Sequence, residues 1–354
     1  MARIRALVIE DSSTVRGRIV DVLSADPEVD VVGQAEDGKR GIELCLELRP
    51  DVITLDMMLP VMSGLATTEY IMAYCPTPIL VVSSSTNRGE LFRMYDALAA
   101  GAVDVLEKPR GDEPDGVWER KLVSMVKLVS RIKVITHVRA RFGHVARART
   151  PIREGPAEAR RVVAIGASTG GPGAIAAILN GLPPGFPLPI LLVIHIGELF
   201  ASAFADWLSG QSPMRVEYAT DGAALPPVGD GRVIMAPAGR HLILRQGRVR
   251  LTDAPPRHSC RPSVDALFES VAREAGAAAV ACLLTGMGRD GAEGMLAIRR
   301  AGGATIAQDE ATSVVFGMPR EAIALGAVER VLPLHDIPVA LAAAAGVDAM
   351  QVRR

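Results

Sequence analysis

The sequence has few cysteines, and none of them has a spacing typical of metal sites or disulfide frameworks. It contains no Cys-x-x-Cys pair and no histidine at zinc-ligand spacing. This pattern argues against both a disulfide framework and a zinc site. The four cysteines are Cys45, Cys75, Cys260 and Cys282.

Long apolar runs are also missing. The N-terminal run, residues 6–9, ends at Glu10 and Asp11, whereas a signal peptide needs a longer apolar core. The longest apolar stretches, residues 187–196 and 277–284, fall well short of a membrane span. We therefore expect a cytoplasmic protein with no direct membrane insertion.

The chain lacks an excess of either charge: 39 Lys and Arg stand against 40 Asp and Glu, a formal net charge of -1. No overall field draws it to nucleic acid or anionic lipid. The C-terminal half also lacks the recognition helix and basic face of a DNA-binding regulator. We expect no nucleic-acid partner, so partner recognition must be local.

What the chain does contain is a regular alternation of short β-branched runs and helical patterns, the order that builds parallel sheets covered by helices. A length of 354 residues favours two domains. The first 110 residues hold five such units, followed by a helix expected over about 117–135. The expected strands are residues 5–10, 29–35, 51–56, 78–83 and 102–107.

Residues 139–161 are rich in arginine and have no sustained apolar periodicity, which predicts a solvated tether. The alternation then resumes and predicts a second doubly wound domain, with a β-hairpin turning at Gln246-Gly247. The expected division is residues 1–125, a linker over 126–160, and a C-terminal domain over 161–346. Strands are expected at residues 161–168, 189–196, 214–219, 232–237, 241–253, 277–287 and 304–309.

Five polar residues of the first half follow strands at their carboxyl ends, which meet at one crevice of an open α/β sheet. Three carboxylates gathered there need a cation, and oxygen ligands suit Mg²⁺. The central aspartate could accept a phosphoryl group, whose charge a lysine could neutralise and whose oxygens a hydroxyl could hydrogen-bond. Any one of the acidic residues alone is better explained as a helix cap. The five are Glu10, Asp11, Asp56, Ser83 and Lys108.

Residues 1 to about 125 resemble a response-regulator receiver domain, which is a flavodoxin-like five-stranded parallel sheet. In this resemblance Glu10 and Asp11 match the acidic pair and Asp56 the phosphoacceptor, while Ser83 and Lys108 match the switch hydroxyl and lysine. It implies that a histidine kinase phosphorylates Asp56 in the presence of Mg²⁺.

The second half begins with Gly166–Pro172, a glycine-rich run that closes a strand and opens a helix. Such a turn can cradle a phosphate or project a nucleophilic serine, here Ser168. His195 and Asp290 stand at equivalent strand ends and favour the serine nucleophile. The chain order Ser, His, Asp excludes the α/β-hydrolase superfamily, although a triad is defined by geometry.

Each of these residues also has a structural explanation. His195 could be a satisfied core histidine, and Asp290 could cap the helix that follows it. His241 and His258 are rival bases, but neither ends a parallel strand.

In the predicted chemistry Ser168 attacks an ester carbonyl, His195 takes its proton and Asp290 orients the imidazole. Backbone N–H groups near Thr169 and Met287 are the candidate oxyanion donors. No cofactor is expected for this hydrolytic step.

From about Arg161 to Leu334 the chain resembles the catalytic domain of the chemotaxis protein-glutamate methylesterase (CheB) family. Matching segments lie at residues 166–172, 261–265, 284–292 and 314–323, with His195 at a strand end. The resemblance implies hydrolysis of glutamate methyl esters on chemoreceptor cytoplasmic helices, release of methanol, and often deamidation of receptor glutamines. It also implies that the unphosphorylated receiver covers the active site and that phosphorylation uncovers it.

Four positions depart from the patterns of these families, and none of them removes a catalytic group. Val105 replaces the aromatic switch residue of many receivers, which puts coupling through ring rotation in doubt. Met58, Ser63 and Ala201 stand where an acidic residue, Asp and Thr are usual. They leave the kinase, the receptor and the signalling array served undefined.

Overall fold

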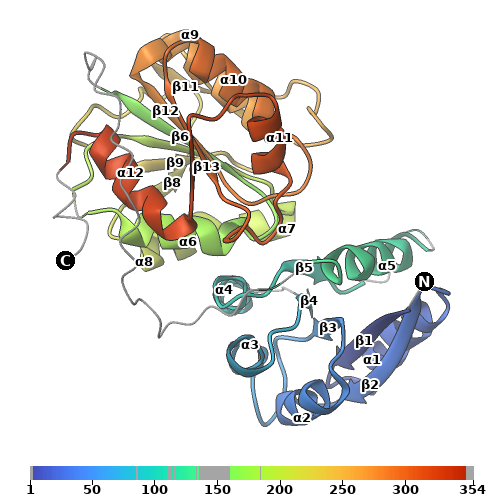
Figure 1. Ribbon diagram of the computed structural model, residues 1–354. Coiled ribbons are helices and arrows are strands. Elements are labelled where there is room, and N and C mark those ends of the chain that lie inside the picture. Colours follow the sequence, from blue (N-terminus) through green and yellow to red (C-terminus); the bar gives the residue numbers. More distant parts are fainter. Residues whose placement is uncertain are drawn as a thin grey trace. The chain divides into compact units, whose positions relative to one another are not determined.

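A computed structural model describes residues 3–84, 87–109, 114, 116–132, 134, 160–183 and 185–347 (Figure 1). The chain divides into two compact units, one made mainly of residues 1–137 and one mainly of residues 138–354. Most of the predicted tether lies outside the described residues. No helix in the described ranges is long and apolar enough to cross a membrane.

The N-terminal unit is the predicted five-stranded parallel sheet, in the order β2-β1-β3-β4-β5. The order reverses between β1 and β3, where a ligand crevice is expected. Helices α2, α3 and α4 pack side by side, and α1 packs on α5. The strands are β1 (Ile4–Ile9), β2 (Val29–Ala35), β3 (Val52–Leu55), β4 (Ile79–Ser83) and β5 (Asp104–Glu107), and the helices are α1 (Ser13–Ser24), α2 (Gly38–Leu48), α3 (Gly64–Tyr74), α4 (Arg88–Ala99) and α5 (Val117–Val129).

Four helices of this unit begin at a short polar residue that caps their first turn. In each case the side-chain oxygen accepts a hydrogen bond from the backbone N–H three residues further along. Such a cap satisfies a donor that the helix itself leaves unpaired. The caps are Ser12, Asp37, Ser63 and Asn87.

Helix α5 ends earlier than the apolar pattern predicted, at Val129 instead of about residue 135. The Ser130 hydroxyl donates to the Lys127 carbonyl, and the N–H of Ile132 bonds back only three residues, to Val129. These tight bonds satisfy the last carbonyls and close the helix. Residues 133 and 135 lie outside the described part.

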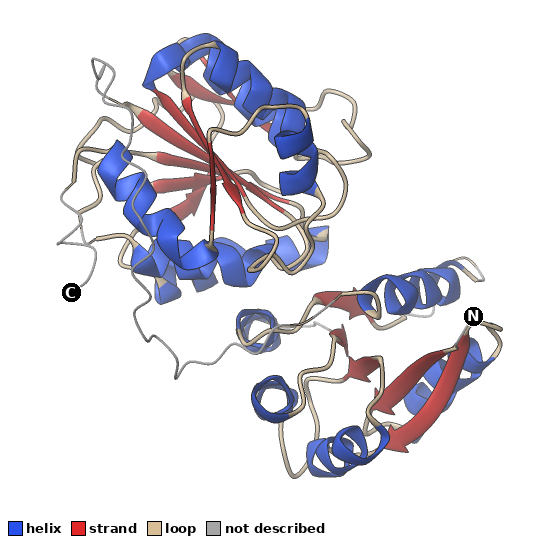
Figure 2. Cartoon of the chain, viewed as in Figure 1, coloured by secondary structure: helices blue, strands red, loops and turns tan. Residues whose placement is uncertain are grey.

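The C-terminal unit is a second parallel sheet, in the order β14-β13-β12-β6-β7-β9-β8, and this confirms the predicted doubly wound fold. Helices α9, α10 and α11 cover one face, and α6, α8 and α12 cover the other (Figures 1 and 2). The strands are β6 (Val162–Ala167), β7 (Ile190–Ile194), β8 (Val216–Tyr218), β9 (Val233–Met235), β12 (Ala279–Leu283), β13 (Ala304–Gln308) and β14 (Arg330–Leu332). The helices are α6 (Gly171–Gly181), α7 (Glu198–Ala201), α8 (Phe204–Gln211), α9 (Val264–Ala275), α10 (Ala292–Arg300), α11 (Met318–Ala324) and α12 (Ile337–Ala344).

The predicted hairpin is present as β10 (His241–Arg245) and β11 (Arg248–Thr252). Both turn residues, Gln246 and Gly247, have positive φ angles, as a two-residue turn of type I′ requires. The hairpin packs on α9, where the Leu244 N–H donates to the Ser270 hydroxyl. Strand β14 was not predicted, because its three residues are too few to show an alternation.

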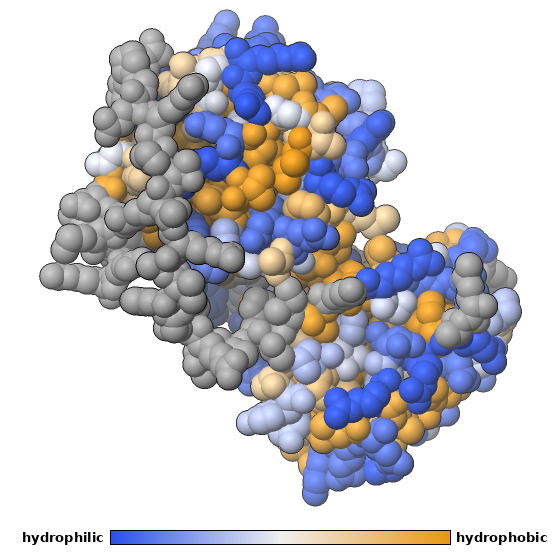
Figure 3. Space-filling model, viewed as in Figure 1, coloured by the Kyte–Doolittle hydropathy of each residue, from blue (hydrophilic) through white to orange (hydrophobic). Residues whose placement is uncertain are grey.

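One hydrophobic core of this unit lies between the sheet, α9, α10 and the hairpin. Phe268 on α9 is fully buried there, together with Val264 and Leu267 on the same helix. Figure 3 shows hydrophilic and hydrophobic residues side by side on the visible face of each unit. The buried apolar side chains of α9 fix this helix against the sheet, and the candidate site described below lies at its N-terminus.

We predict that Phe268→Ala destabilises the C-terminal unit by about 3–5 kcal/mol, because it leaves a cavity in a packed core. Leu325→Ala is the control, since this side chain is exposed, and it should change stability by no more than about 0.5 kcal/mol. Urea unfolding followed by circular dichroism measures both. Equal losses in the two variants would contradict the assigned core.

Candidate functional sites

Strand register brings Ser168 and His195 to neighbouring positions in the C-terminal sheet. Strand β6 lies between β7 and β12, and Ala167 pairs with Ile194. Each candidate residue immediately follows one of these paired positions, and the His195 N–H donates to the Ala167 carbonyl at 3.0 Å. The two side chains thus arise from adjacent carboxyl ends of parallel strands, as the sequence predicted.

Ser168 sits in a tight turn held on both sides. Its N–H donates to the Thr285 carbonyl at 3.0 Å, and its own carbonyl accepts from Gly171 at 2.6 Å. A Cβ added at Gly286 would lie 2.8 Å from the Ser168 Cβ, so only glycine lets the β12 loop approach this closely. Gly170, with φ +76°, then directs the chain into α6.

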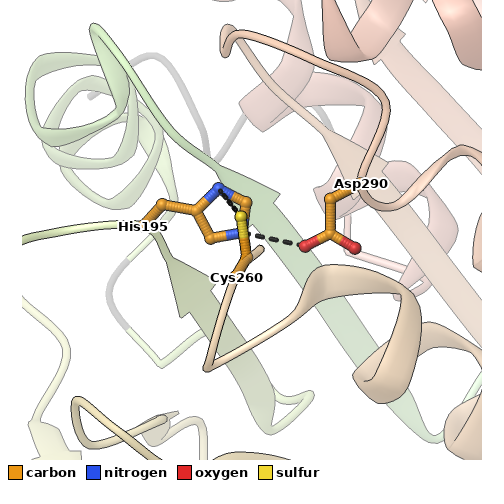
Figure 4. A group of neighbouring side chains, drawn as sticks. All are labelled: His195, Cys260 and Asp290. Carbon is orange, nitrogen blue, oxygen red and sulfur yellow. Dashed lines mark hydrogen bonds and ion pairs between the residues drawn. The ribbon is translucent and has the colours of Figure 1, made fainter. Parts of the chain in front are cut away.

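His195 and Asp290 form a hydrogen bond at the same end of the sheet. The distance from His195 Nε2 to Asp290 Oδ2 is 2.8 Å, and the Asp290 side chain is almost completely buried (Figure 4). Within the described residues, the Ser168 hydroxyl makes no hydrogen bond to His195 or to another group. The structure therefore joins the base and the acid of the predicted triad and leaves the serine beside them.

Asp290 is held by more than His195. Its Oδ1 accepts from the Ser263 hydroxyl at 2.7 Å and from the Asp265 N–H at 3.0 Å, and its Oδ2 accepts from the Val264 N–H at 2.7 Å. These donors belong to the first turn of α9, whose N-terminus favours a negative charge. The structure does not support the alternative that Asp290 caps α10. Gly291 is the N-cap of that helix, and no side-chain hydrogen bond caps its first turn.

Sequence reasoning assigned no role to Ser263, although the segment containing it was noted as a family match. Its side chain is fully buried, and its hydroxyl both donates to Asp290 and accepts from the Ala266 N–H. A serine that starts a helix is explained by capping alone. Only the fold shows that Ser263 also contacts the candidate acid.

The pKa values of His195 and Asp290 are shifted in opposite directions. Burial lowers the pKa of His195, but the hydrogen bond to Asp290 and the neighbouring Cys260 outweigh burial and raise it to about 9. Burial raises the pKa of Asp290, but the hydrogen bonds from His195 and the Asp265 backbone hold it below its usual range. Asp290 is thus ionised, so His195 Nε2–H donates to it and the imidazolium is stabilised.

The two rival bases, His241 and His258, form hydrogen bonds to groups other than Asp290. His241 Nδ1 accepts from the Ser263 N–H at 3.1 Å, and its Nε2 lies 3.2 Å from the Pro255 carbonyl. His258 bonds to Asp265 through Nε2 at 3.0 Å and to Arg289 through Nδ1 at 3.2 Å. Neither histidine follows a parallel strand, so the geometry favours His195.

The candidate oxyanion donors flank Ser168. Among the hydrogen bonds of the described residues, none is donated by the backbone N–H of Thr169 or of Met287. The Thr169 carbonyl accepts from the Thr285 hydroxyl at 2.9 Å, which ties the Ser168 turn to the β12 loop. The arrangement leaves two backbone donors available near the serine.

A second charged cluster lies at the switch point of the N-terminal sheet. Lys108 Nζ is 3.0 Å from Asp56 Oδ2 and 2.8 Å from Glu10 Oε2, and all three side chains are largely buried. Ile9 pairs with Leu55, so Glu10 and Asp56 follow neighbouring strand positions. The predicted strand-end convergence of these three residues is present in the structure.

The remaining residues of this cluster differ in exposure. Ser83 is buried at the end of β4, and its carbonyl accepts from the Lys108 N–H at 3.0 Å. Asp11 is exposed, and one oxygen each from Glu10, Asp11 and Asp56 lie within 4.8 Å of one another. Burial raises the pKa of Glu10 to about 7, with Asp56 adding to this effect and Lys108 opposing it.

These carboxylates fit a divalent cation. Glu10 Oε2 is buried and accepts no hydrogen bond within the described structure, although Lys108 lies close by. An oxygen-only donor set with one exposed side suits Mg²⁺.

Comparison with known proteins shows two matching family models and relatives that match nearly the whole chain. Residues 163–341 match the CheB methylesterase family model, and residues 6–114 match the response regulator receiver domain. A protein-glutamate methylesterase/protein-glutamine glutaminase of Anaeromyxobacter dehalogenans is 46% identical over 344 residues, which cover 96% of each chain. The chain belongs to the CheB methylesterase family.

Other proteins and solved structures are also similar to this chain. A protein of the same description from Nitrosospira multiformis is 43% identical and covers 96% of each chain. The CheB methylesterase catalytic domain of Thermotoga maritima is 37% identical over 51% of this chain and 97% of its own, with a TM-score of 0.49. The response regulator domain of Thermotoga maritima CheB is 34% identical over 37% of this chain and 98% of its own, with a TM-score of 0.33.

We predict that Asp290→Asn lowers the pKa of His195 well below 9, because burial then acts without the bond to an ionised carboxylate. Titration of the His195 ring signals by NMR measures the change. The control is Glu329→Gln, an exposed carboxylate of the same unit. An unchanged His195 pKa in Asp290→Asn would show that the pair is not coupled.

Proposed function

We propose that this chain is a phosphorylation-controlled methylesterase that removes methyl groups from glutamate esters on the cytoplasmic helices of chemoreceptors. The observation that carries the proposal is the buried His195–Asp290 pair at a strand end directly beside Ser168. The relatives named protein-glutamate methylesterase/protein-glutamine glutaminase support the reaction class. The proposed reaction takes place in the cytoplasm, which contains both the chemoreceptor helices and the histidine kinase.

In the proposed reaction the Ser168 hydroxyl oxygen attacks the ester carbonyl carbon. Because a pKa of about 9 keeps most His195 protonated at neutral pH, the fraction of molecules with a neutral imidazole carries the reaction. In that form His195 takes the hydroxyl proton at Nδ1, since its Nε2–H is engaged with Asp290. The proposal requires the Ser168 hydroxyl to come within hydrogen-bonding reach of Nδ1 in the substrate complex, since hydrogen bonds of resting active sites are commonly long. Asp290 keeps the imidazole oriented and stabilises its positive charge.

The tetrahedral intermediate places a negative charge on the former carbonyl oxygen. The N–H groups of Thr169 and Met287 are our proposed donors to it, because neither has another acceptor in the described structure. Collapse breaks the bond to the methoxy oxygen, which receives the proton from His195 and leaves as methanol. Water then hydrolyses the Ser168 ester by the same proton path.

The same residues can deamidate glutamine. An amide carbonyl is attacked in the same way, and the leaving nitrogen takes the proton from His195 and departs as ammonia. The acyl-enzyme and the product carboxylate are then identical to those of the ester reaction. We therefore assign both activities to one site.

We propose that Asp56 is the phosphoacceptor of a histidine kinase. Glu10, Asp11 and Asp56 would hold Mg²⁺, which when bound neutralises negative charge on the phosphoryl group. Lys108, now paired with Asp56, is placed to pair with the added phosphoryl oxygens, and the Ser83 hydroxyl is the candidate switch donor. Val105 is only partly buried and carries no ring, so rotation of an aromatic ring at this position has no part in the proposed switching.

We predict that Ser168→Ala lowers methanol release from methyl-labelled receptor membranes roughly 10⁴-fold or more, because the nucleophile is lost. Counting volatile methanol gives the rate. Leu325→Ala serves as a control for handling, since its side chain is exposed and has no part in the proposed reaction. Release by Ser168→Ala at the wild-type rate would refute the assignment of Ser168.

We predict that Asp56→Asn abolishes the stimulation of methanol release by a small phosphodonor and leaves basal turnover intact. The variant keeps the shape of the side chain but cannot form the acyl phosphate. Asp30→Asn, an exposed carboxylate on β2, should remain fully stimulated. Stimulation that persists in Asp56→Asn would place the phosphoacceptor elsewhere, and loss of basal turnover would contradict simple gating.

A further inference from the structure

Cys260 lies against the candidate base but has no part in the proposed reaction. Its Sγ is 3.7 Å from His195 Nδ1, and its thiol donates to the His258 carbonyl at 3.4 Å. Figure 4 shows the side chains of Cys260, His195 and Asp290 gathered from three separate segments. Cys260 is partly exposed, whereas Cys45, Cys75 and Cys282 are buried.

These three side chains offer the ligand set that zinc prefers. Thiolate sulfur, imidazole nitrogen and carboxylate oxygen all bind Zn²⁺ at about 2.0–2.3 Å, which places ligands of a tetrahedral site about 3.3–3.7 Å apart. One such atom from each residue already lies within 4.8 Å of the others. Cys260 belongs to a loop and is partly exposed, so its side chain has room to turn toward a metal. His195 Nε2 and Asp290 Oδ2, now 2.8 Å apart, would separate by about 0.5 Å to admit the ion.

We infer that Zn²⁺ binds Cys260 Sγ, His195 Nε2 and Asp290 Oδ2, with water as the fourth ligand, and thereby inhibits the enzyme. The metal takes the position of the proton between His195 and Asp290. That proton and the thiol proton of Cys260 pass to solvent. The inhibitory effect rests on the proposed role of His195 as base, whereas metal binding itself does not.

The surroundings of Asp290 suit a metal ligand. Its Oδ1 keeps the bonds from Ser263 and Asp265, and its Oδ2 keeps the bond from the Val264 N–H. Such outer hydrogen bonds orient ligands before the metal arrives. Three protein ligands with an open position describe an exchangeable site, not a closed structural one.

The linear spacing of cysteine and histidine gave no zinc signal, because the ligands come from three distant segments. Two other groups of the described residues could compete for a metal. The receiver carboxylates offer only oxygen, which suits Mg²⁺, and His258 with Asp265 and Asp290 offers nitrogen and oxygen but no sulfur. Excess Mg²⁺ in every assay keeps the receiver carboxylates occupied. A signal from sulfur then reports the Cys260 site alone.

The first experiment titrates the full-length, tag-free protein with Co²⁺ and records its absorption spectrum. Wild type should develop a sulfur-to-cobalt charge-transfer band and tetrahedral d–d bands, and Zn²⁺ should displace both. Cys260→Ala should lose the charge-transfer band, whereas Cys282→Ala, a buried cysteine of the same unit, should keep it. Absence of the band in wild type, or its survival in Cys260→Ala, would overturn the proposal.

The second experiment measures ester hydrolysis against Zn²⁺ concentration, with each variant normalised to its own metal-free rate. We expect inhibition of wild type that a chelator reverses, and at least a roughly tenfold higher half-inhibitory Zn²⁺ concentration for Cys260→Ala. Zinc binding that leaves the wild-type rate unchanged would contradict the inhibitory role. If the protein hydrolysed no ester at all, the proposed function would fail while the cobalt spectrum still decided the metal site.

Discussion

Asp290 is a carboxylate with almost no access to water, and its burial is tolerable because four donors share its charge. Three of these donors come from the opening turn of α9 and the fourth is His195. The requirement fixes the β12 loop, the start of α9 and the end of β7 in one arrangement. It also explains the raised pKa of His195, since an imidazolium completes the charge balance that burial would otherwise penalise. The candidate chemistry depends on this one satisfied charge.

The N-terminal unit also buries carboxylates, and there a lysine balances their charge. Glu10 and Asp56 follow neighbouring parallel strands and are buried together, so their mutual repulsion has to be offset. Lys108, at the end of β5, contacts both carboxylates. In both units the parallel strands deliver polar side chains to one edge at the point where strand order reverses. One rule of α/β architecture thus creates the candidate phosphoacceptor cluster in one domain and the candidate hydrolytic cluster in the other.

This rule is also why much could be predicted from the sequence. Asp56, His195 and Ser168 could be placed because each ends an apolar run, and a strand end has only one edge at which to appear. Ser263 and Cys260 could not be placed, since the path of a loop decides what they contact. Strand β14 was missed because three residues carry no period, and the end of α5 was misplaced because Ser130 satisfies the last turn in a way that an apolar pattern does not reveal.

The central claim is that the His195–Asp290 pair activates Ser168, and an active-site phosphonate tests it most directly. A fluorophosphonate probe labels a serine only where a neighbouring base increases its nucleophilicity. Peptide mass spectrometry should find the adduct on Ser168 in the wild type and almost none in His195→Gln. Equal labelling of Ser168 in the two proteins, or an adduct on a different residue, would contradict the account.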